Sequence, residues 1–556
     1  MARDRSINQT LHQKSSRSRQ GCWTCREKKV KCDEERPQCR RCKRLDRECD
    51  YAPRRRKPYP KRNRSAKSHL QSQANDAGSS IPTPAVSRES REIPLLDHSP
   101  TSPVTSPISP SSLTRYNLSV TGGFQPSLAD QEAIGCFRTV VSASVDTKDP
   151  AYSVPAIIAS LGESNSMVMH MVCALGFQEL SNQQAWDPSP AMEHYSSSML
   201  LLAQAVQRPS SENATDLDSI LATLWLMILY EQRYGDGIGQ GLVAHLRGAA
   251  MVLKHRLGNL RRLLECNFSE PDEQWRISPF AGRMIVWIAF LDASAESLHL
   301  GGDFNRVLGD AMSGLAENEI FSRLRGFTAI HRYSASLHTS VWESNYPQSQ
   351  LLDDLESREL FYLYGECGQI RHILAQLTKM YSTNEQEIDP LPVARALHDI
   401  GQRYSEILSV APRLDLTSAG DRRCFVTNVR FVVPIYHAAI LSYFRITAFS
   451  KPFKFSEKQR HGLQEIFTLA YQAYQDEGES AMARIAWPLF MAALETDDLA
   501  HQDWVSLRFA RLRYRGENYR RAEQALLLLL ADQRTRKERV NLLDYFQSDR
   551  LERFII

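Results

Sequence analysis

Six cysteines fall between residues 22 and 49, and their spacing constrains this part of the chain more than any other feature. The pattern is C-x2-C-x6-C-x6-C-x2-C-x6-C, so its second half repeats the first at an offset of 17 residues. A tetrahedral zinc site made of thiolates uses four sulfurs, so six sulfurs are two too few for two separate sites. They suffice if two sulfurs each contact both metals. The repeat therefore predicts a binuclear metal cluster held by Cys22, Cys25, Cys32, Cys39, Cys42 and Cys49.

Two other roles of clustered cysteines fit this chain less well. A disulfide framework requires an oxidising compartment, and residues 1–20 contain no apolar segment of the kind found in secretory signals. Iron–sulfur clusters are also bound by thiolates, but the compact C-x2-C-x2-C run of that class is missing. A zinc cluster is the interpretation that fits the spacing of the sulfurs.

Residues 21–49, GCWTCREKKVKCDEERPQCRRCKRLDREC, resemble the fungal zinc binuclear cluster transcription factors at every cysteine and at Pro37, in the loop between the halves. The cofactors that this resemblance implies are two Zn²⁺ ions. It also implies a role for each cysteine: Cys22 and Cys39 bridge the metals, Cys25 and Cys32 complete one site, and Cys42 and Cys49 complete the other.

The two halves of the repeat differ in charge. Where the first half has Lys28, Lys29 and Lys31, the second half has Leu45, Asp46 and Glu48. Carboxylates are poor neighbours for the electronegative major groove of DNA, whereas lysines donate hydrogen bonds to guanine O6 and N7. We therefore expect the first half to enter the groove.

The basic residues around the cluster each have an expected contact with double-stranded DNA. By resemblance, Lys28 and Lys29 match the base-contacting pair of the family, which implies a CGG-type half-site. Contacts to phosphates set the register of a protein on DNA and carry no sequence information. We assign these to Arg26, Lys31, Arg40, Arg41 and Lys43. The alternative is a solvated basic face without specific contacts.

The charge of the chain is unevenly distributed. Residues 1–70 contain 23 Lys and Arg against 8 Asp and Glu, a net charge of +15. The remaining residues contain 45 Lys and Arg against 56 Asp and Glu, a net charge of −11. The net charge of the whole chain is therefore only +4. The basic part predicts strong, salt-dependent attraction to nucleic acid, and the acidic part predicts repulsion from it.

A basic tail follows the cluster. Such a run is typical of a nuclear localisation signal or a nucleic-acid patch, so we expect the protein in the nucleus. Residues 51–77 contain no apolar heptad and are interrupted by prolines, so the short dimerising coiled coil that many relatives carry here is absent. Any homodimer would then form through the C-terminal domain. The localisation residues are Arg54, Arg55, Arg56, Lys57, Lys61, Arg62 and Arg64.

Residues 69–125 have the composition of a disordered linker. Serine and proline dominate, and Ser-Pro steps occur at Ser99, Ser102, Ser106 and Ser109. Such a stretch cannot form a packed core, so we interpret it as a flexible tether. Proline-directed phosphorylation, which would add negative charge beside the DNA-binding module, is the alternative role.

Residues 126–556 show the periodicity of a large all-α domain. Residues 216–230 are apolar on nearly all sides, which predicts a central helix capped by Asp216. We expect the helices to pack as antiparallel pairs. Two predicted helical faces are Met192, Tyr195, Met199, Leu202 and Val206, and Leu242, Leu246, Ala249 and Leu253. Further helices are predicted at 359–381, 393–410, 424–448, 461–475 and 517–533.

Catalytic and membrane signals are scarce in this domain. It contains no H-E-x-x-H, no Gly-rich phosphate loop and no G-x-S-x-G, so we expect no enzyme. It contains no run of 18 apolar residues, so we expect no membrane span. Isolated histidines are interpreted as hydrogen-bonded core or groove residues: His170, His194, His245 and His437. Isolated cysteines are interpreted as buried thiols, with redox sensing as the alternative: Cys136, Cys173, Cys266, Cys367 and Cys424.

Two stretches resemble the second class of fungal-specific transcription factor domain. One is residues 191–256, with a helix leading into HLRGA, and the other begins at WPLF (487–490) and continues to Trp504. The resemblance implies a helical regulatory region, which in some members is suspected of sensing small molecules, so a small-molecule effector is a further candidate partner. The acidic residues at 497–504 resemble an activation motif, but we interpret them as part of the helical structure.

These features together predict a sequence-specific DNA-binding regulator of RNA polymerase II transcription that works with the transcription machinery or co-regulators. The alternative is a small-molecule receptor, or an enzyme-like helical domain, that uses the zinc cluster as its DNA address. A ligand pocket would favour the receptor, and paired titratable groups would favour the enzyme. An RNA-binding module is disfavoured, because Trp23 is the only aromatic residue between Cys22 and Cys49.

The predicted parts are an N-terminal arm (1–17), a Zn2Cys6 domain (18–53), the basic tail (54–68), the linker (69–125) and the all-α regulatory domain (126–556).

Overall fold

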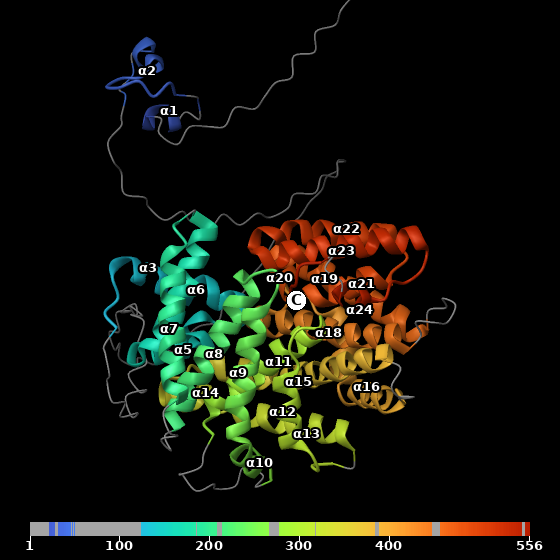
Figure 1. Cartoon of the computed structure of the whole chain (residues 1–556). Helices are drawn as coiled ribbons and strands as arrows, with labels where there is room; N and C mark the ends of the chain where they lie inside the picture. Colours follow the sequence, from blue (N-terminus) through green and yellow to red (C-terminus); the bar gives the residue numbers. More distant parts are fainter. Residues whose placement is uncertain are drawn as a thin grey trace, which may run out of the picture. The chain divides into compact units, whose positions relative to one another are not determined.

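The structure is a computed structural model, and it divides the chain into two compact units, Met1–Thr101 and Ser102–Ile556 (Figure 1). The predicted N-terminal arm, the basic tail and almost all of the linker lie outside the residues that it describes. The described residues are 22–27, 30, 32–45, 47, 49, 124–184, 186–207, 214–265, 277–316, 318–383, 389–447, 456–547 and 551–556.

The smaller unit contains two short helices, α1 at Trp23–Glu27 and α2 at Arg40–Arg44. Their boundaries differ by the same 17 residues that separate the two halves of the cysteine repeat. The loop between the halves includes a cis peptide bond at Arg36–Pro37. Sulfur atoms fill the interior of this unit in place of a hydrophobic core.

The larger unit is built from α-helices, and the part of it that the structure describes contains no β-strand. The predicted fold, a small zinc module followed by a large all-α domain, is confirmed. The longer helices are α3 (Leu128–Cys136), α5 (Val154–Ser164), α6 (Ser166–Gln184), α7 (Ser189–Gln207), α8 (Ala214–Tyr234), α9 (Gln240–His255), α10 (Leu257–Glu265), α11 (Pro279–Glu296), α12 (Asp303–Met312), α13 (Glu319–Ser334), α15 (Gln348–Thr383), α16 (Leu391–Arg403), α18 (Arg423–Thr447), α19 (Glu457–Glu477), α21 (Ala486–Glu495), α22 (Leu499–Leu512) and α23 (Glu517–Arg536). Shorter elements are the π-helix at Phe137–Val141, α4 (Ser142–Val145), α14 (Leu337–Trp342), α17 (Ser405–Val410), α20 (Glu479–Arg484) and α24 (Leu542–Gln547).

Consecutive helices pack as antiparallel pairs, as the sequence predicts. In α6 and α7 the contacts run in opposite directions along the two helices: Ser198 donates a hydrogen bond to the carbonyl of Met167, and His194 contacts His170. Helices α18 and α19 form a second such pair, and α22 and α23 a third, which Figure 1 shows side by side in red.

Two hydrophobic cores fill the larger unit. The first draws mainly on the helices from α3 to α14, and the second mainly on those from α15 to α24. Helices α11 and α15 lie where the cores meet, and the rings of Phe290 and Tyr364 are 4.1 Å apart between their centroids. The final described segment joins the cores, because Phe554 packs into the second and Ile555 into the first.

Local sequence determines where several helices begin. The hydroxyl of Ser127 accepts a hydrogen bond from the N–H of Asp130, whose carboxylate accepts one from the N–H of Ser127. This reciprocal pair satisfies two otherwise unpaired donors at the start of α3. Before α11, Ser278 is the cap and Pro279 occupies the first helical position, where a missing N–H costs nothing.

The predicted apolar face of α7 is wrong in part. Tyr195 and Leu202 are buried, but Met192, Met199 and Val206 are exposed. The buried face instead includes Ala191 and Ser198, so it is rotated from the predicted one. The physical reason is that small side chains let α6 and α7 approach closely, and the Ser198 hydroxyl finds a backbone acceptor on α6. The predicted face of α9 is confirmed, since all four of its residues are buried.

The predicted cap at Asp216 is also wrong. Helix α8 begins at Ala214, which places Asp216 inside its first turn. An acidic residue in the first turn is favoured by the positive end of the helix dipole, so it gives the same sequence signal as a cap. The central position of the helix is confirmed, because residues 221–230 are all buried.

Helix α18 is the described helix that is long and apolar enough to cross a membrane. However, 72% of its most apolar window is buried inside the larger unit, where it packs against α15, α19 and α21. Two arginines on this helix are also buried in ion pairs, Arg430 with Asp476 and Arg445 with Glu495. Helix α18 is therefore a core helix of this unit.

Candidate metal centre

The two halves of the cysteine repeat have the same backbone geometry. In the first half the N–H of Cys25 donates to Cys22 Sγ at 3.4 Å, and in the second the N–H of Cys42 donates to Cys39 Sγ at 3.4 Å. The sequence repeat is therefore a structural repeat. The backbone bonds that follow show the same offset, from Val30 N–H to the Cys25 carbonyl and from Arg47 N–H to the Cys42 carbonyl.

The sulfur atoms are spaced as two zinc ions require. Cys22 Sγ lies 3.8 Å from Cys39 Sγ and 3.7 Å from Cys42 Sγ, and Cys25 Sγ lies 3.7 Å from Cys39 Sγ. With Zn–S bonds of about 2.3 Å, tetrahedral geometry separates the sulfurs of one site by about 3.8 Å. Two sets of four sulfurs converge, and both contain Cys22 and Cys39. The first set is Cys22, Cys25, Cys32 and Cys39, and the second is Cys22, Cys39, Cys42 and Cys49.

The surroundings of the sulfurs suit a structural metal site. Burial raises the pKa of the Cys25 and Cys42 thiols to about 12, so a bound metal ion would supply the charge that holds these sulfurs as thiolates. Backbone N–H groups add further donors, from Glu34 to Cys32 Sγ at 3.4 Å and from Cys39 to Cys49 Sγ at 3.2 Å. Because each set supplies four sulfurs, each would complete the ligand shell of a structural zinc ion.

The residues predicted to read DNA bases fall outside the described part of the chain. This applies to Lys28 and Lys29, and also to Lys31, which is predicted to contact phosphate. The backbone of Arg26 lies in α1, but its side chain is not described. The localisation residues at 54–64 are outside as well.

The other predicted phosphate contacts lie together on α2. Arg40 and Lys43 are exposed, and Arg41 is half-buried. Arg40 forms a two-pronged ion pair with Glu35, with N–O distances of 2.8 and 3.1 Å. The carboxylate of Asp33 accepts the N–H groups of Arg40 and Arg41 at 3.1 and 3.4 Å and so fixes the start of the helix. The basic residues of α2 are therefore partly neutralised by two carboxylates of the loop between the halves.

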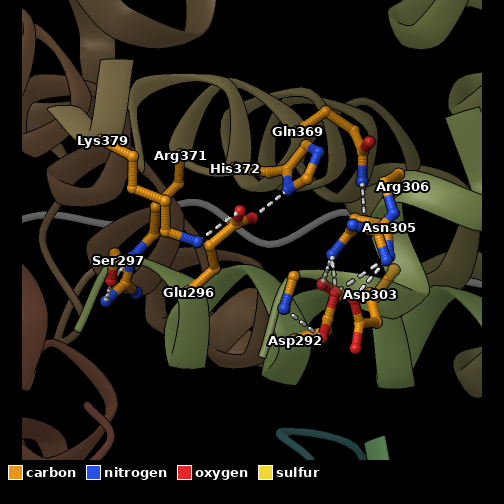
Figure 2. Close-up of polar contacts among 12 residues, drawn as sticks. Asp292, Glu296, Ser297, Asp303, Asn305, Arg306, Gln369, Arg371, His372 and Lys379 are labelled. Atoms are coloured by element: carbon orange, nitrogen blue, oxygen red, sulfur yellow. Dashed lines mark hydrogen bonds and ion pairs between the residues drawn. The ribbon is translucent and has the colours of Figure 1, made fainter. Parts of the chain in front are cut away.

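The larger unit contains a buried polar network between α11, α12 and α15, which Figure 2 shows. Asp292 on α11 accepts hydrogen bonds from the backbone N–H groups of Gly302 and Asn305, both at 2.8 Å. The side chain of Asn305 in turn accepts one from Gln369 on α15 at 2.9 Å. Burial raises the pKa of Asp292.

Glu296 is the second acid of this network. It pairs with His372 on α15 and, at 3.1 Å, with Lys379. Burial works to raise the pKa of Glu296, but hydrogen bonds and charge from His372 and Lys379 outweigh it and hold the pKa below its usual range. Neither Glu296 nor Asp292 lines either main cavity of the unit. The paired groups thus link α11 to α12 and α15.

A cavity of about 720 Å³ lies between the two cores of the larger unit. This volume falls within the range of small-molecule sites, which are mostly apolar with a few convergent polar groups. Its wall includes Trp287 and Phe290 on α11, Tyr364 on α15, Phe431 on α18 and Trp487 on α21.

Three basic residues of this cavity were not predicted from the sequence: Arg283 on α11, His331 on α13 and His338 on α14. The sequence does carry a weak signal for two of them. His331, Ser334 and His338 are spaced by three and four residues, so they form a polar stripe on one helical face. Their relation to Arg283 depends on packing between distant segments and leaves no local pattern.

The four histidines singled out from the sequence lie inside or at the edge of the helical packing. His194 Nε2 lies 3.1 Å from the Asp130 carboxylate, and its Nδ1 lies 2.8 Å from His170 Nδ1. His245 contacts a tyrosine hydroxyl on α7 at 2.6 Å. His437 differs from the prediction, since neither ring nitrogen has a hydrogen-bond partner in the described part of the chain and burial lowers its pKa to about 3.

Cys136, Cys173 and Cys367 are buried as predicted, whereas Cys424 is half-buried. Burial raises the pKa of Cys136 and Cys424 to about 11, that of Cys173 to about 12, and that of Cys367 well above the usual value. Because the thiolate is the reactive form, these surroundings argue against redox sensing. Cys266 lies outside the described residues.

A cluster of six cysteines followed by a large all-α unit defines a class of zinc cluster protein. Residues 20–58 match the fungal Zn(2)-Cys(6) binuclear cluster domain, which binds two zinc ions through its six cysteines. Residues 145–550 match the fungal specific transcription factor domain. The chain belongs to this family of fungal Zn2Cys6 transcription factors.

Similarity to individual relatives covers short stretches. The chain is 66% identical over 38 residues to the aspercryptin biosynthesis cluster-specific transcription regulator atnN of Emericella nidulans, which is 7% of this chain and 6% of that protein. It is 38% identical over 81 residues to the transcriptional regulator alnR of the same organism, and this stretch covers 13% of this chain and 20% of that protein. It is 39% identical over 79 residues to the transcription factor lfc1 of Flammulina velutipes, and this stretch covers 14% of this chain and 26% of that protein. The chain thus spans about a quarter or less of the length of these relatives. No solved structure matches it.

Proposed function

We propose that this protein is a sequence-specific DNA-binding regulator of RNA polymerase II transcription that acts in the nucleus. The observation that carries the proposal is the sharing of Cys22 and Cys39 between two sets of four sulfurs. Two Zn²⁺ ions bridged in this way hold both halves of the repeat in place without a hydrophobic core. A rigid and strongly basic module of this size is suited to place a helix end in the major groove of DNA.

The first half of the repeat is the DNA reader in this proposal. Lys28 and Lys29 contact the guanines of a CGG-type half-site, and Cys22 and Cys39 are the bridging ligands. The partial neutralisation of α2 by Asp33 and Glu35 of the preceding loop supports the assignment of base contacts to the first half. Phosphate contacts come from Arg26, Lys31, Arg40, Arg41 and Lys43. For Arg40 such a contact means exchanging the carboxylate of Glu35 for a phosphate oxygen.

The larger unit is the regulatory part, and we propose no enzymatic activity for it. The basic tail directs the protein to the nucleus, and the acidic larger unit acts on the transcription machinery or on co-regulators. This division is supported by the charge difference of the sequence, +15 in residues 1–70 against −11 in the rest.

A homodimer formed through the larger unit is a further part of the proposal. The exposed apolar residues Met192, Met199, Leu200 and Val206 on α7 form a stripe that a second copy would cover. Light scattering of the full chain at micromolar concentration tests this, with a dimer expected. Met199→Glu should shift the dimer toward monomer. A monomeric wild-type protein would contradict this part of the proposal.

The experiment that tests the function compares genome-wide occupancy in the native cell with transcript levels after deletion of the gene. We expect occupied sites to share a CGG-type triplet and to lie beside genes whose transcripts change. A Cys39→Ser variant at equal abundance is the control and should lose occupancy. Occupancy that is unrelated to the triplet, or that survives in the Cys39→Ser variant, would contradict the proposal.

A further inference from the structure

The cavity between the two cores has walls that suit a planar apolar molecule. The aromatic rings form a continuous row across the junction of α11, α15 and α18, because Phe290 lies 4.1 Å from Tyr364 and Tyr364 lies 5.0 Å from Phe431 between ring centroids. Trp287 and Trp487 add further indole surface. Offset contacts with aromatic rings stabilise bound rings beyond the effect of buried area.

The charged groups that line this cavity favour an anion. The basic ones are Lys148, Arg233, Arg283, Arg371, Arg484 and Arg515, and the acidic ones are Asp146, Glu179, Asp353 and Asp354. Six positive charges thus face four negative charges. The excess is concentrated where an arginine lacks a carboxylate partner.

Arg283 is one of the lining arginines that have no carboxylate partner in the described part of the chain. It donates from Nε to the Ser334 hydroxyl and from Nη2 to the Ser334 carbonyl, both at 3.2 Å, and in the described part of the chain it forms no ion pair. The carboxylates that act on it electrostatically are engaged elsewhere. Asp354 pairs with Lys148, and Asp146 accepts backbone N–H groups of Lys148 and Val154. Arg283 is half-buried, and a guanidinium that is partly withdrawn from water without a counter-ion is costly, so an anion is stabilised at this position.

The imidazole rings of His331 and His338 lie near Arg283, and each has hydrogen-bonding capacity to spare. His331 and His338 are each 5% exposed, and both line the cavity. Among the described residues, neither Nδ1 of His331 nor Nε2 of His338 has a hydrogen-bond partner. Burial, followed by the charge of Arg283, lowers the pKa of both rings, to about 3 for His331. The rings are therefore neutral at physiological pH, and each carries one N–H that can donate to an acceptor.

Arg371, by contrast, is already satisfied. It donates to the hydroxyls of Ser294 and Ser297 and to the carbonyl of Ile556, and it stacks over the ring of Trp487 at 4.0 Å. It therefore forms part of the wall, whereas Arg283, among the described residues, hydrogen-bonds only with Ser334 and leaves room for an added anion.

We propose that this cavity binds an aromatic organic acid, whose carboxylate or sulfonate accepts hydrogen bonds from Arg283 and from the imidazoles of His331 and His338. The ring system of the acid lies along the aromatic row. In the context of the proposed function, such an acid is the effector of the regulator. The binding step itself does not depend on DNA.

The test uses a matched pair of fluorescent probes on the full chain. Anilinonaphthalene sulfonate carries an anionic group, and N-phenylnaphthylamine has the same rings without it. We expect one sulfonate probe per chain, bound more tightly than the neutral probe. Arg283→Gln should weaken the sulfonate probe by about tenfold to a hundredfold, the size of a charged hydrogen bond, and leave the neutral probe unchanged.

Arg515→Gln is the matched control. It removes the same charge from an exposed residue at the rim of the same cavity, so it should change sulfonate binding by no more than about twofold. The neutral probe also reports whether Arg283→Gln keeps the cavity folded. If that variant binds neither probe, Arg283→Lys, which keeps the charge, is the deciding variant. A retained preference for the sulfonate probe supports the inference, and a lost preference contradicts it.

Two results would overturn the inference: wild-type protein that binds both probes equally, or Arg515→Gln that weakens sulfonate binding as much as Arg283→Gln does. A DNA titration on the same preparations separates this inference from the proposed function. Loss of probe preference with intact DNA binding rejects only the ligand site. Failure to bind DNA with intact probe preference rejects only the regulator.

Discussion

The Sγ atoms of Cys22 and Cys39 lie 3.8 Å apart, although the two residues are 17 positions apart in the chain. They are the two sulfurs shared by both sets of four, and α1 and α2 begin directly after them. Each shared sulfur therefore connects the metal positions to the start of a helix. Loss of one should disturb both halves of the repeat at once.

The first prediction compares a shared sulfur with an unshared one. Cys39→Ser should release both zinc ions, whereas Cys49→Ser should release mainly one, because Cys49 belongs to a single set of four sulfurs. The measurement is the zinc content per chain of the purified full-length variants. Equal zinc loss in the two variants would show that Cys39 is not a bridge.

The second prediction separates base contacts from phosphate contacts. Lys29→Ala should cost about 1–3 kcal/mol on a CGG-containing duplex and little on random DNA. Arg41→Ala is the control, because a phosphate contact should weaken both duplexes alike and flatten the salt dependence. Binding titrations on the two duplexes measure both effects. If Lys29→Ala weakens both duplexes equally, Lys29 is not a base reader.

The third prediction concerns a buried acid at the end of α21. Glu495 pairs with Arg445 and, at 2.6 Å, with Arg539, and all three side chains are almost fully enclosed. Glu495→Ala removes the buried carboxylate that both arginines contact, so the free energy of unfolding of the larger unit should fall by about 3–5 kcal/mol. Urea unfolding followed by tryptophan fluorescence measures this.

Asp503 is the matched control for this change. It lies eight positions further along, and its ion pair with Arg534 is largely exposed. Exposed pairs contribute little, so Asp503→Ala should change the unfolding free energy by no more than about 0.5 kcal/mol. Similar losses for Asp503→Ala and Glu495→Ala would contradict the structural role of Glu495.

The fourth prediction is a pH dependence of stability. Burial raises the pKa of Asp218 to about 7, and the hydroxyl of Ser278 donates to its carboxylate. Because the folded pKa is raised above the unfolded value of about 3.9, the stabilisation is complete below pH 4 and is lost as pH rises through 7. The unfolding free energy of the wild type should fall by about 2–3 kcal/mol between pH 5 and pH 8 from this group.

Asp218→Asn isolates this contribution, because an amide does not titrate. The unfolding free energy of the variant should lack the fall of about 2–3 kcal/mol that Asp218 causes between pH 5 and pH 8. The variant should also be more stable than the wild type at pH 8. Urea unfolding at the two pH values measures both. If the two proteins show the same pH dependence, Asp218 titrates normally and is not the source.

The parts that could be predicted from sequence rest on local spacing. The cysteine repeat determines which sulfurs lie close together, because each half is held by bonds within a few residues, such as Cys25 N–H to Cys22 Sγ. Helical periodicity likewise locates the helices: the predicted stretch 424–448 coincides almost completely with α18, and 359–381 lies inside the longer α15.

The parts that could not be predicted depend on contacts between distant segments. Periodicity alone could not select the buried face of α7, because the deciding contact is that of Ser198 with Met167 on another helix. The cavity residues were missed for the same reason. Arg283 and His331 are 48 positions apart in the sequence, and the packing of α11 against α13 brings them to one wall.

The central claim is that the zinc-loaded cysteine cluster is what reads DNA. Fluorescence anisotropy of a labelled CGG-containing duplex, titrated with the full chain, tests it most directly when zinc is first removed with a chelator and then restored. We expect tight binding by the native protein, weaker binding to a duplex with the triplet scrambled, loss of the preference without zinc, and recovery when zinc returns. A preference for the triplet that persists after all zinc has been removed would contradict the claim.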